Sequence, residues 1–187
     1  HIVSRRQRQM CIRDRFKNLI VLSPLIYAIH HFEEHIIFNF IEWKLKYFSH
    51  SAAALSTEAI LSILVCIFVI FTLLHLVKNN RASAYVILYI LFTIQVINAF
   101  FHIFFSLYYS DFSPGTITSV LLYLPVNFCI VRTAFKEGWL KTYSEYAVIA
   151  FLGTITFVLF EIYGPIVIVL SVIASLGYYV WANKKLT

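Results

Sequence analysis

The sequence predicts an all-α fold, a polytopic transmembrane helical bundle with five to six spans. Hydrophobic residues make up 60% of the chain and charged residues 13%, with a mean hydropathy of +0.80. A soluble domain carries about 25% charged residues, so a soluble fold is excluded. The apolar runs are long enough to cross a bilayer core of about 30 Å, and only 5 Gly and 4 Pro interrupt the chain.

Hydropathy places the elements one after another along the chain. The expected helices cover residues 16–41, 52–77, 83–109 and 116–135, and a last apolar stretch covers 147–181. As one helix, that last stretch would be about 52 Å long, too long for one crossing. Gly164-Pro165 lies in its middle, and proline stops a helix. Two short helices are therefore expected, with a single kinked helix as the alternative.

Basic residues predict the orientation, because cytoplasmic loops are enriched in Lys and Arg. With the N-terminus inside, the inner loops hold seven Lys or Arg and the outer loops two. Both termini are predicted to be cytoplasmic, in a protein integral to a cell membrane. Residues 1–15 carry five Arg and one Asp. They are predicted to be a non-native basic leader, with 16–187 forming one transmembrane domain.

The most informative segment is 30–35, which reads His-His-Phe-Glu-Glu-His inside an apolar helix. An ionisable side chain in the bilayer core costs several kcal/mol unless it is paired or bound. At 100° per residue, His30 and Glu34 form one i,i+4 pair, and His31 and His35 form another. Each pair can close on one ion or one proton. The polar arc is about 200° wide, so the cluster needs a partner helix.

A narrower polar stripe is expected on the helix over 83–109. It comprises Gln95, Asn98 and His102, and it continues through Ser106 and Tyr109. A polar stripe at helical period on an apolar helix indicates a bundle interior. By depth, this stripe should meet the 30–35 cluster in one shared cavity, near the outer side of the membrane.

Further polar residues lie at similar depth. Asn127 and Glu161 are expected to approach the same cavity, whereas Glu58 is expected to be solvated. His75, at the inner end of its helix, is expected at the membrane–water interface, and so is Trp139. The cysteines Cys11, Cys66 and Cys129 lack metal-ligand spacing, and the last two are expected to be buried.

Three motifs then match a known family in the right order. They are His30-His31-Phe32-Glu33-Glu34, Asn98-Ala99-Phe100-Phe101-His102 and Pro114-Gly115-Thr116-Ile117-Thr118. The chain resembles the HXXEE family of uncharacterised, mostly bacterial integral membrane proteins over roughly residues 18–180, and this resemblance implies a bacterial cell membrane. The family name describes a motif, so the resemblance implies a membrane location and a polar site but no reaction.

The residue types around this site predict a divalent metal such as zinc, iron or manganese. The expected ligands are His30, Glu34 and His102, and the expected catalytic residues are Glu33, Glu34 and Asn98. Either glutamate could act as general base, and Asn98 could orient His102 or hold a substrate carbonyl. The alternative is a hydrogen-bond network that pins the first helix to the third.

Three functions stay open at this point. The first is a metal-dependent intramembrane hydrolase acting on a lipid or a small membrane-embedded substrate. The second is a proton- or cation-coupled transporter that uses the His/Glu cluster as a relay, although no inverted repeat is visible. The third is a structural membrane protein. The lipid bilayer is the expected partner, and nothing in the sequence favours binding to nucleic acid.

Overall fold

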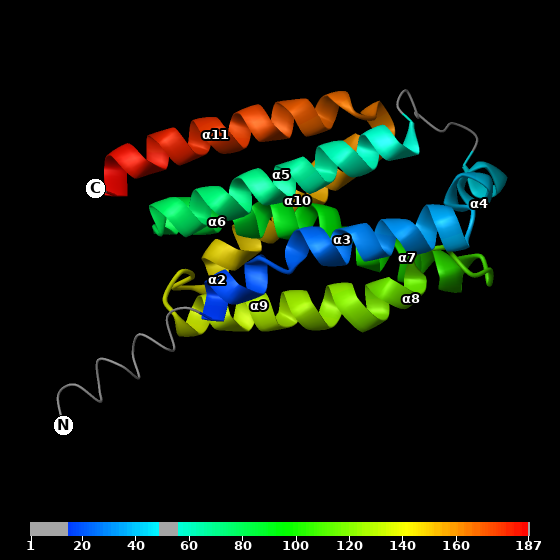
Figure 1. Cartoon of the computed structure of the whole chain (residues 1–187), viewed down its shortest axis with the longest axis horizontal. Helices are drawn as coiled ribbons and strands as arrows, with labels where there is room; N and C mark the ends of the chain where they lie inside the picture. Colours follow the sequence, from blue (N-terminus) through cyan, green and yellow to red (C-terminus); the bar gives the residue numbers. More distant parts are fainter. Residues whose placement is uncertain (1–14, 49–55, 187) are drawn as a thin grey trace.

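The computed structural model describes residues 15–48 and 56–186, and within these ranges the regular structure is helical (Figure 1). Three of the segments are π-helical turns, labelled η. In chain order the elements are α2 (Arg15–Ile20), α3 (Ser23–Phe32), η1 (Glu33–Ile37), α4 (Phe40–Tyr47), α5 (Thr57–Lys78), α6 (Arg81–Leu91), η2 (Phe92–Val96), α7 (Ile97–Tyr108), α8 (Thr116–Thr118), η3 (Ser119–Tyr123), α9 (Leu124–Lys136), α10 (Tyr143–Tyr163) and α11 (Ile166–Leu186).

Five helices among the described residues are long and apolar enough to cross a membrane. They are Thr57–Lys78, Arg81–Tyr108, Thr116–Lys136, Tyr143–Tyr163 and Ile166–Lys184. The segment 15–37 runs alongside them, so that the start of α2 and the end of α11 lie at the same end of the bundle (Figure 1). The all-α membrane-type bundle predicted from the sequence is confirmed, whereas the cytoplasmic placement of the termini stays a prediction.

The first predicted helix is not continuous, and this corrects the expectation of one helix over 16–41. The chain turns at Val21-Leu22 between α2 and α3, where Pro24 occupies the first turn of the new helix. Proline fits that position because it has no N–H to place in the helix. A second break follows η1, where Phe38 is extended and Asn39 caps α4 through Glu42 N–H.

The last apolar stretch divides as expected. α10 ends at Tyr163 and α11 begins at Ile166. Gly164 between them has φ 72°, a backbone conformation that favours glycine. Elsewhere, side-chain caps on Ser56, Asn80 and Thr142 begin α5, α6 and α10, because each satisfies an N–H that the first helical turn leaves unpaired.

The centre of the bundle is α6, where most side chains are buried. It packs against α5, α10 and α11. His75 and Trp139, expected at the interface, are both buried. Cys66 and Cys129, expected to be buried, are exposed on the outer faces of α5 and α9. Cys11 and residues 1–14 of the leader lie outside the described residues.

Candidate metal centre

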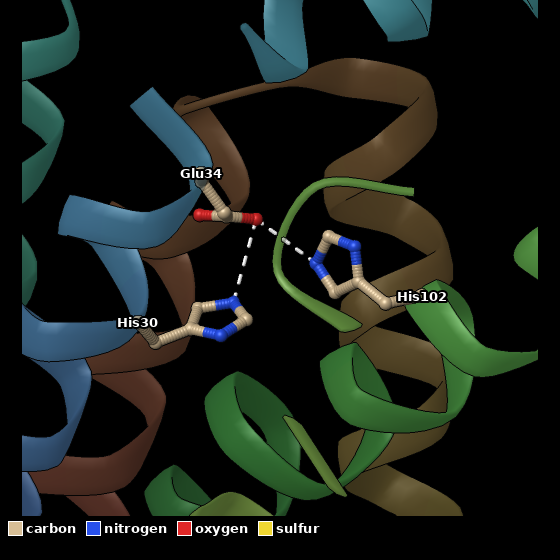
Figure 2. A group of neighbouring side chains, drawn as sticks. All are labelled: His30, Glu34 and His102. Atoms are coloured by element: carbon tan, nitrogen blue, oxygen red, sulfur yellow. Dashed lines mark ion pairs between the residues drawn. The ribbon is translucent and has the colours of Figure 1, made fainter. Parts of the chain in front are cut away.

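Three buried side chains from three elements meet near the end of the bundle that α4 covers. His30 comes from α3, Glu34 from η1 and His102 from α7 (Figure 2). Glu34 Oε1 lies 2.9 Å from His102 Nε2 and 3.4 Å from His30 Nε2. The three ligand atoms all lie within 4.8 Å of one another. The predicted meeting of the first helix and the third is therefore present in the structure.

Each of the two imidazoles is held through its Nδ1 atom by a hydroxyl group. His30 Nδ1 is 2.7 Å from Thr118 Oγ1, and His102 Nδ1 is 3.0 Å from Ser113 Oγ. Metal-binding histidines are commonly fixed in this way through the nitrogen that does not bind the metal. His102 Nε2 is buried with no hydrogen-bond partner among the described residues. The polar atom that faces it is Glu34 Oε1, in the ion pair at 2.9 Å.

Gly115 forms the wall behind both imidazoles. It has φ 99°, in the left-handed region that side chains rarely adopt. A Cβ atom placed there would lie 2.9 Å from His30 Cε1 and 3.0 Å from His102 Cε1. The turn after Pro114 therefore needs glycine for two reasons, the backbone conformation and the close approach of two rings.

Glu33 is turned away from Glu34 and holds the same turn. Its Oε1 accepts hydrogen bonds from the N–H groups of Gly115 and Ile117, at 3.2 and 3.1 Å. Its Oε2 accepts one from the N–H of Thr118 at 2.7 Å. A carboxylate is favourable where a helix begins, because the first N–H groups are unpaired. Glu33 thus links η1 to the start of α8.

Asn98 lies on α7, one turn before His102, and its Nδ2 is 3.0 Å from His30 Nε2. With Glu34, His31 and His35 it borders a cavity of about 190 Å³. The rest of the cavity wall is mainly apolar and comes from α3, α4, α5, α6, η2, α10 and α11. Lys44 and Glu161, paired at 2.7 Å, border the same cavity.

The predicted stripe on the third helix is directed into the bundle. Gln95 Nε2 donates to the carbonyl of Ser23 at 3.0 Å, and its Oε1 accepts from Asn127 at 2.8 Å. Ser106 bonds with Thr116 at 2.9 Å. These bonds join α3 to the helix over 81–108 and that helix to the one over 116–136. Asn127 is bonded to Gln95 and does not join the His30–Glu34–His102 cluster. Glu161 is likewise occupied by Lys44, and Glu58 is exposed as expected.

The sequence did not reveal the residues that position the ligands. Ser113 and Thr118 hold the two histidines, and the Tyr123 ring packs on His30 with centroids 4.2 Å apart. Thr118 and Gly115 belong to the Pro-Gly turn motif, so that motif was the available signal. Its connection with the histidines could not be read from spacing, since the partners lie 88 residues apart in the case of His30 and Thr118.

Comparison with known proteins gives one match. The family model described as a protein of unknown function with HXXEE motif matches residues 21–130. The chain belongs to the HXXEE family. This match includes all three predicted ligands and the Pro-Gly turn, and it stops before α10 and α11, short of the 18–180 expected from the motifs. Neither the curated proteins nor the solved structures give a match.

Proposed function

We propose that this HXXEE protein is a metal-dependent hydrolase that acts inside the membrane on a substrate with an apolar chain. The observation that carries the proposal is the position of Glu34. One of its oxygens faces two buried imidazoles, and the residue borders a cavity whose other walls are mainly apolar. A buried charge of this kind in a membrane bundle indicates function more often than structure.

The donor atoms suit a divalent cation. Zinc bonds to imidazole nitrogen and carboxylate oxygen are about 2.0–2.2 Å long, so tetrahedral ligands are about 3.3 Å apart. The contacts of Glu34 Oε1 with His102 and His30, at 2.9 and 3.4 Å, bracket that value. The two histidines and one carboxylate also suit iron and manganese. His102 Nε2, buried and 2.9 Å from Glu34 Oε1, is the nitrogen through which His102 would bind a cation.

The residues around the cation then have distinct tasks. A bound cation would polarise a carbonyl and lower the pKa of a water molecule. With a single cation bound, Glu34 would accept the proton of that water through the oxygen not turned to His102. Asn98 donates to His30 Nε2 in this structure, and it is placed at the cavity wall to donate to a substrate oxygen once His30 binds the cation. Glu33 keeps the Pro-Gly turn in place, because three N–H groups already occupy its oxygens.

The cavity restricts the substrate to one with an apolar chain. Side chains such as Ile60, Leu64, Ile94 and Phe157 line it. Apolar pockets with a few convergent polar groups are typical of binding sites for small molecules. A lipid or a small membrane-embedded ester or amide fits this description, with its reacting carbonyl at Glu34 and Asn98 and its chain along α5, α10 and α11.

The test uses the whole chain, purified in detergent. Elemental analysis is expected to find a bound divalent metal, and chelation is expected to abolish hydrolysis of p-nitrophenyl laurate, with recovery on adding the metal back. The laurate should be cleaved faster than the acetate. His102→Ala should lose both metal and activity, whereas His75→Ala, which removes a buried histidine elsewhere, should keep both. Hydrolysis that survives chelation, or proton flux in sealed proteoliposomes without hydrolysis, would overturn the proposal.

A further inference from the structure

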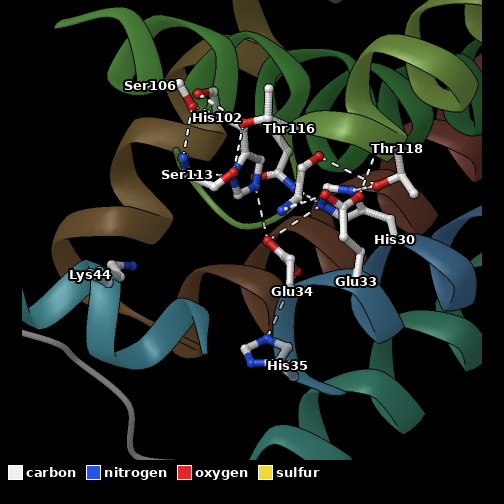
Figure 3. Close-up of polar contacts among 12 residues, drawn as sticks. His30, Glu33, Glu34, His35, Lys44, His102, Ser106, Ser113, Thr116 and Thr118 are labelled. Atoms are coloured by element: carbon white, nitrogen blue, oxygen red, sulfur yellow. Dashed lines mark hydrogen bonds and ion pairs between the residues drawn. The ribbon is translucent and has the colours of Figure 1, made fainter. Parts of the chain in front are cut away.

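A second group of metal-binding side chains lies on the other side of Glu34. His31, Glu34 and His35 each offer a ligand atom, and these atoms also lie within 4.8 Å of one another. Glu34 Oε2 is 3.8 Å from His35 Nε2, and the rings of His31 and His35 are 4.4 Å apart between centroids. Figure 3 shows Glu34 between His35 on one side and His30 with His102 on the other.

The two oxygens of Glu34 therefore face different pairs of imidazoles. Oε1 faces His30 and His102, and Oε2 faces His35. Glu34 and His35 lie in a π-helical turn. In η1 the Phe38 N–H bonds to the Glu33 carbonyl five residues earlier, at 3.1 Å. Such turns insert one residue into a helix and are frequent at functional sites.

We propose that Glu34 bridges two divalent cations, the first held by His30 and His102 and the second by His31 and His35. Each cation would then have two imidazole nitrogens and one carboxylate oxygen from the protein. A carboxylate bridge keeps two cations about 3.5–4 Å apart, the spacing of known two-metal hydrolytic sites. This inference rests on the proposed function and gives the same site a second ion. With both ions bound, Glu34 would be a bridging ligand and not the general base, and the two cations together would lower the pKa of the attacking water.

The second position lies on the path of the substrate. His31, Glu34 and His35 all border the cavity, whereas His30 and His102 lie behind Glu34 and do not. A cation at the second position would be open to the cavity on its remaining sides. It would be able to bind the substrate carbonyl, while the first cation lies deeper. Two cations together activate both the water and the carbonyl, which one cation does less well.

Charge balance also favours this arrangement, because two divalent cations in an apolar interior need more than one carboxylate. Glu33 is adjacent to the first position and buried. It therefore supplies a second carboxylate beside the bridging Glu34.

The test counts ions in the whole chain loaded with Mn²⁺ in nanodiscs. The wild-type protein should bind about two ions per chain and give the electron paramagnetic resonance signal of a coupled pair. His31→Gln and His35→Gln should each retain about one ion with the six-line signal of isolated Mn²⁺. His75→Gln, the matched control, should bind as the wild type does.

The outcomes separate the two proposals. If His31→Gln and His35→Gln hold as many ions as the wild type, the second position is refuted while the first stands. If wild type binds one ion and His102→Gln alone removes it, the same conclusion follows. If no variant and no wild-type sample binds Mn²⁺ or Zn²⁺, both the second position and the metal-dependent function fail together.

Discussion

The two ends of the bundle bury histidines in closely similar ways, yet among the described residues only one end brings a carboxylate and a second imidazole to the histidine. At the α4 end, His102 is fully buried, with Nδ1 on Ser113 and Nε2 without a hydrogen bond. At the opposite end, His75 is fully buried, with Nδ1 on Ser83 at 2.9 Å and Nε2 again without a hydrogen bond among the described residues. The local arrangement of ring and hydroxyl is the same.

The difference lies in what surrounds the side of each ring away from the hydroxyl. His102 faces Glu34, whereas the ring of His75 contacts Phe16 and Trp139 edge-on, at 5.1 and 4.9 Å between centroids. In the described part of the chain His75 takes part in no ion pair. A buried histidine with a hydroxyl partner is therefore a packing element unless a carboxylate and a second imidazole share its free side.

The largest effect is expected from removing that carboxylate. Glu34→Gln keeps the shape of the side chain but removes the charge that both imidazoles face. Bound metal should fall to background, and hydrolysis of p-nitrophenyl laurate should fall by roughly 1,000-fold, within the range for loss of a general base. Elemental analysis measures the bound metal, and initial rates measure the hydrolysis. Glu145→Gln, near the His75 end of the bundle, is the control. Equal metal content in the two variants would contradict the idea that only the His102 end binds a cation.

The second effect tests the glycine behind the rings. Gly115→Ala adds a Cβ within about 3 Å of both histidines and forces a residue with φ 99°. Gly138→Ala is a matched control, because Gly138 has φ 77° but nothing within 4 Å of its Cβ position. Both should lose about 1–3 kcal/mol of stability from the backbone. Only Gly115→Ala should also lose metal, and metal retained at the wild-type level would argue against contact with the rings.

A smaller effect is expected at the hydroxyls that hold the histidines. Ser113→Ala and Thr118→Val should each weaken metal affinity by about 10- to 100-fold, as for other partners of metal ligands. Ser83→Ala removes the equivalent hydroxyl beside His75 and should leave the affinity unchanged. Competition with a fluorescent chelator measures all three. Similar losses in the three variants would show that the hydroxyls act through general stability.

Next in size is the ion pair at the cavity border. Lys44→Met and Glu161→Gln each break the 2.7 Å contact between α4 and α10. Because both side chains are partly exposed, the pair contributes about 0–1 kcal/mol. The KM for the laurate ester should rise by no more than about fivefold, with kcat unchanged. The double variant should be no worse than either single one, and additive losses would mean that the two residues act separately.

The smallest effect concerns the pH dependence of α4. The Tyr47 hydroxyl, at 2.6 Å, and the Lys46 ammonium, at 2.9 Å, lower the pKa of the Asp111 carboxyl from its ordinary 3.8. A lowered pKa in the folded state stabilises the fold above the ordinary value, and this contribution is lost as pH falls through the lowered one. The protection factors of the α4 amides against hydrogen exchange should therefore fall in acid, and Asp111→Asn should remove that pH dependence.

Particular residues show how far the sequence could go. The i,i+4 spacing of His30 and Glu34, and the stripe of Asn98 and His102, were enough to predict that two helices share one site. Those predictions depend only on helical period and on the cost of leaving polar groups in an apolar phase. The Gly164-Pro165 break followed from backbone chemistry in the same way.

Other features depended on contacts between distant segments. Helical period placed Glu33 beside Glu34, but only the fold shows that the two carboxylates point to different partners. Likewise, only the fold shows that His75 is packed between aromatic rings whereas His102 faces a carboxylate. The breaks of the first helix at Val21-Leu22 and after η1 were also missed, because an apolar run reads as continuous whether or not its backbone bends.

By itself the sequence determined that this chain forms an all-α bundle of membrane type and that polar residues of its first and third predicted helices face each other. The reason is physical, since apolar length and helical period are local properties. The tertiary structure alone decided which nitrogens face Glu34, which hydroxyls fix them and where the apolar cavity opens. These depend on how segments about 70 to 90 residues apart meet, and no local preference of the chain specifies that meeting.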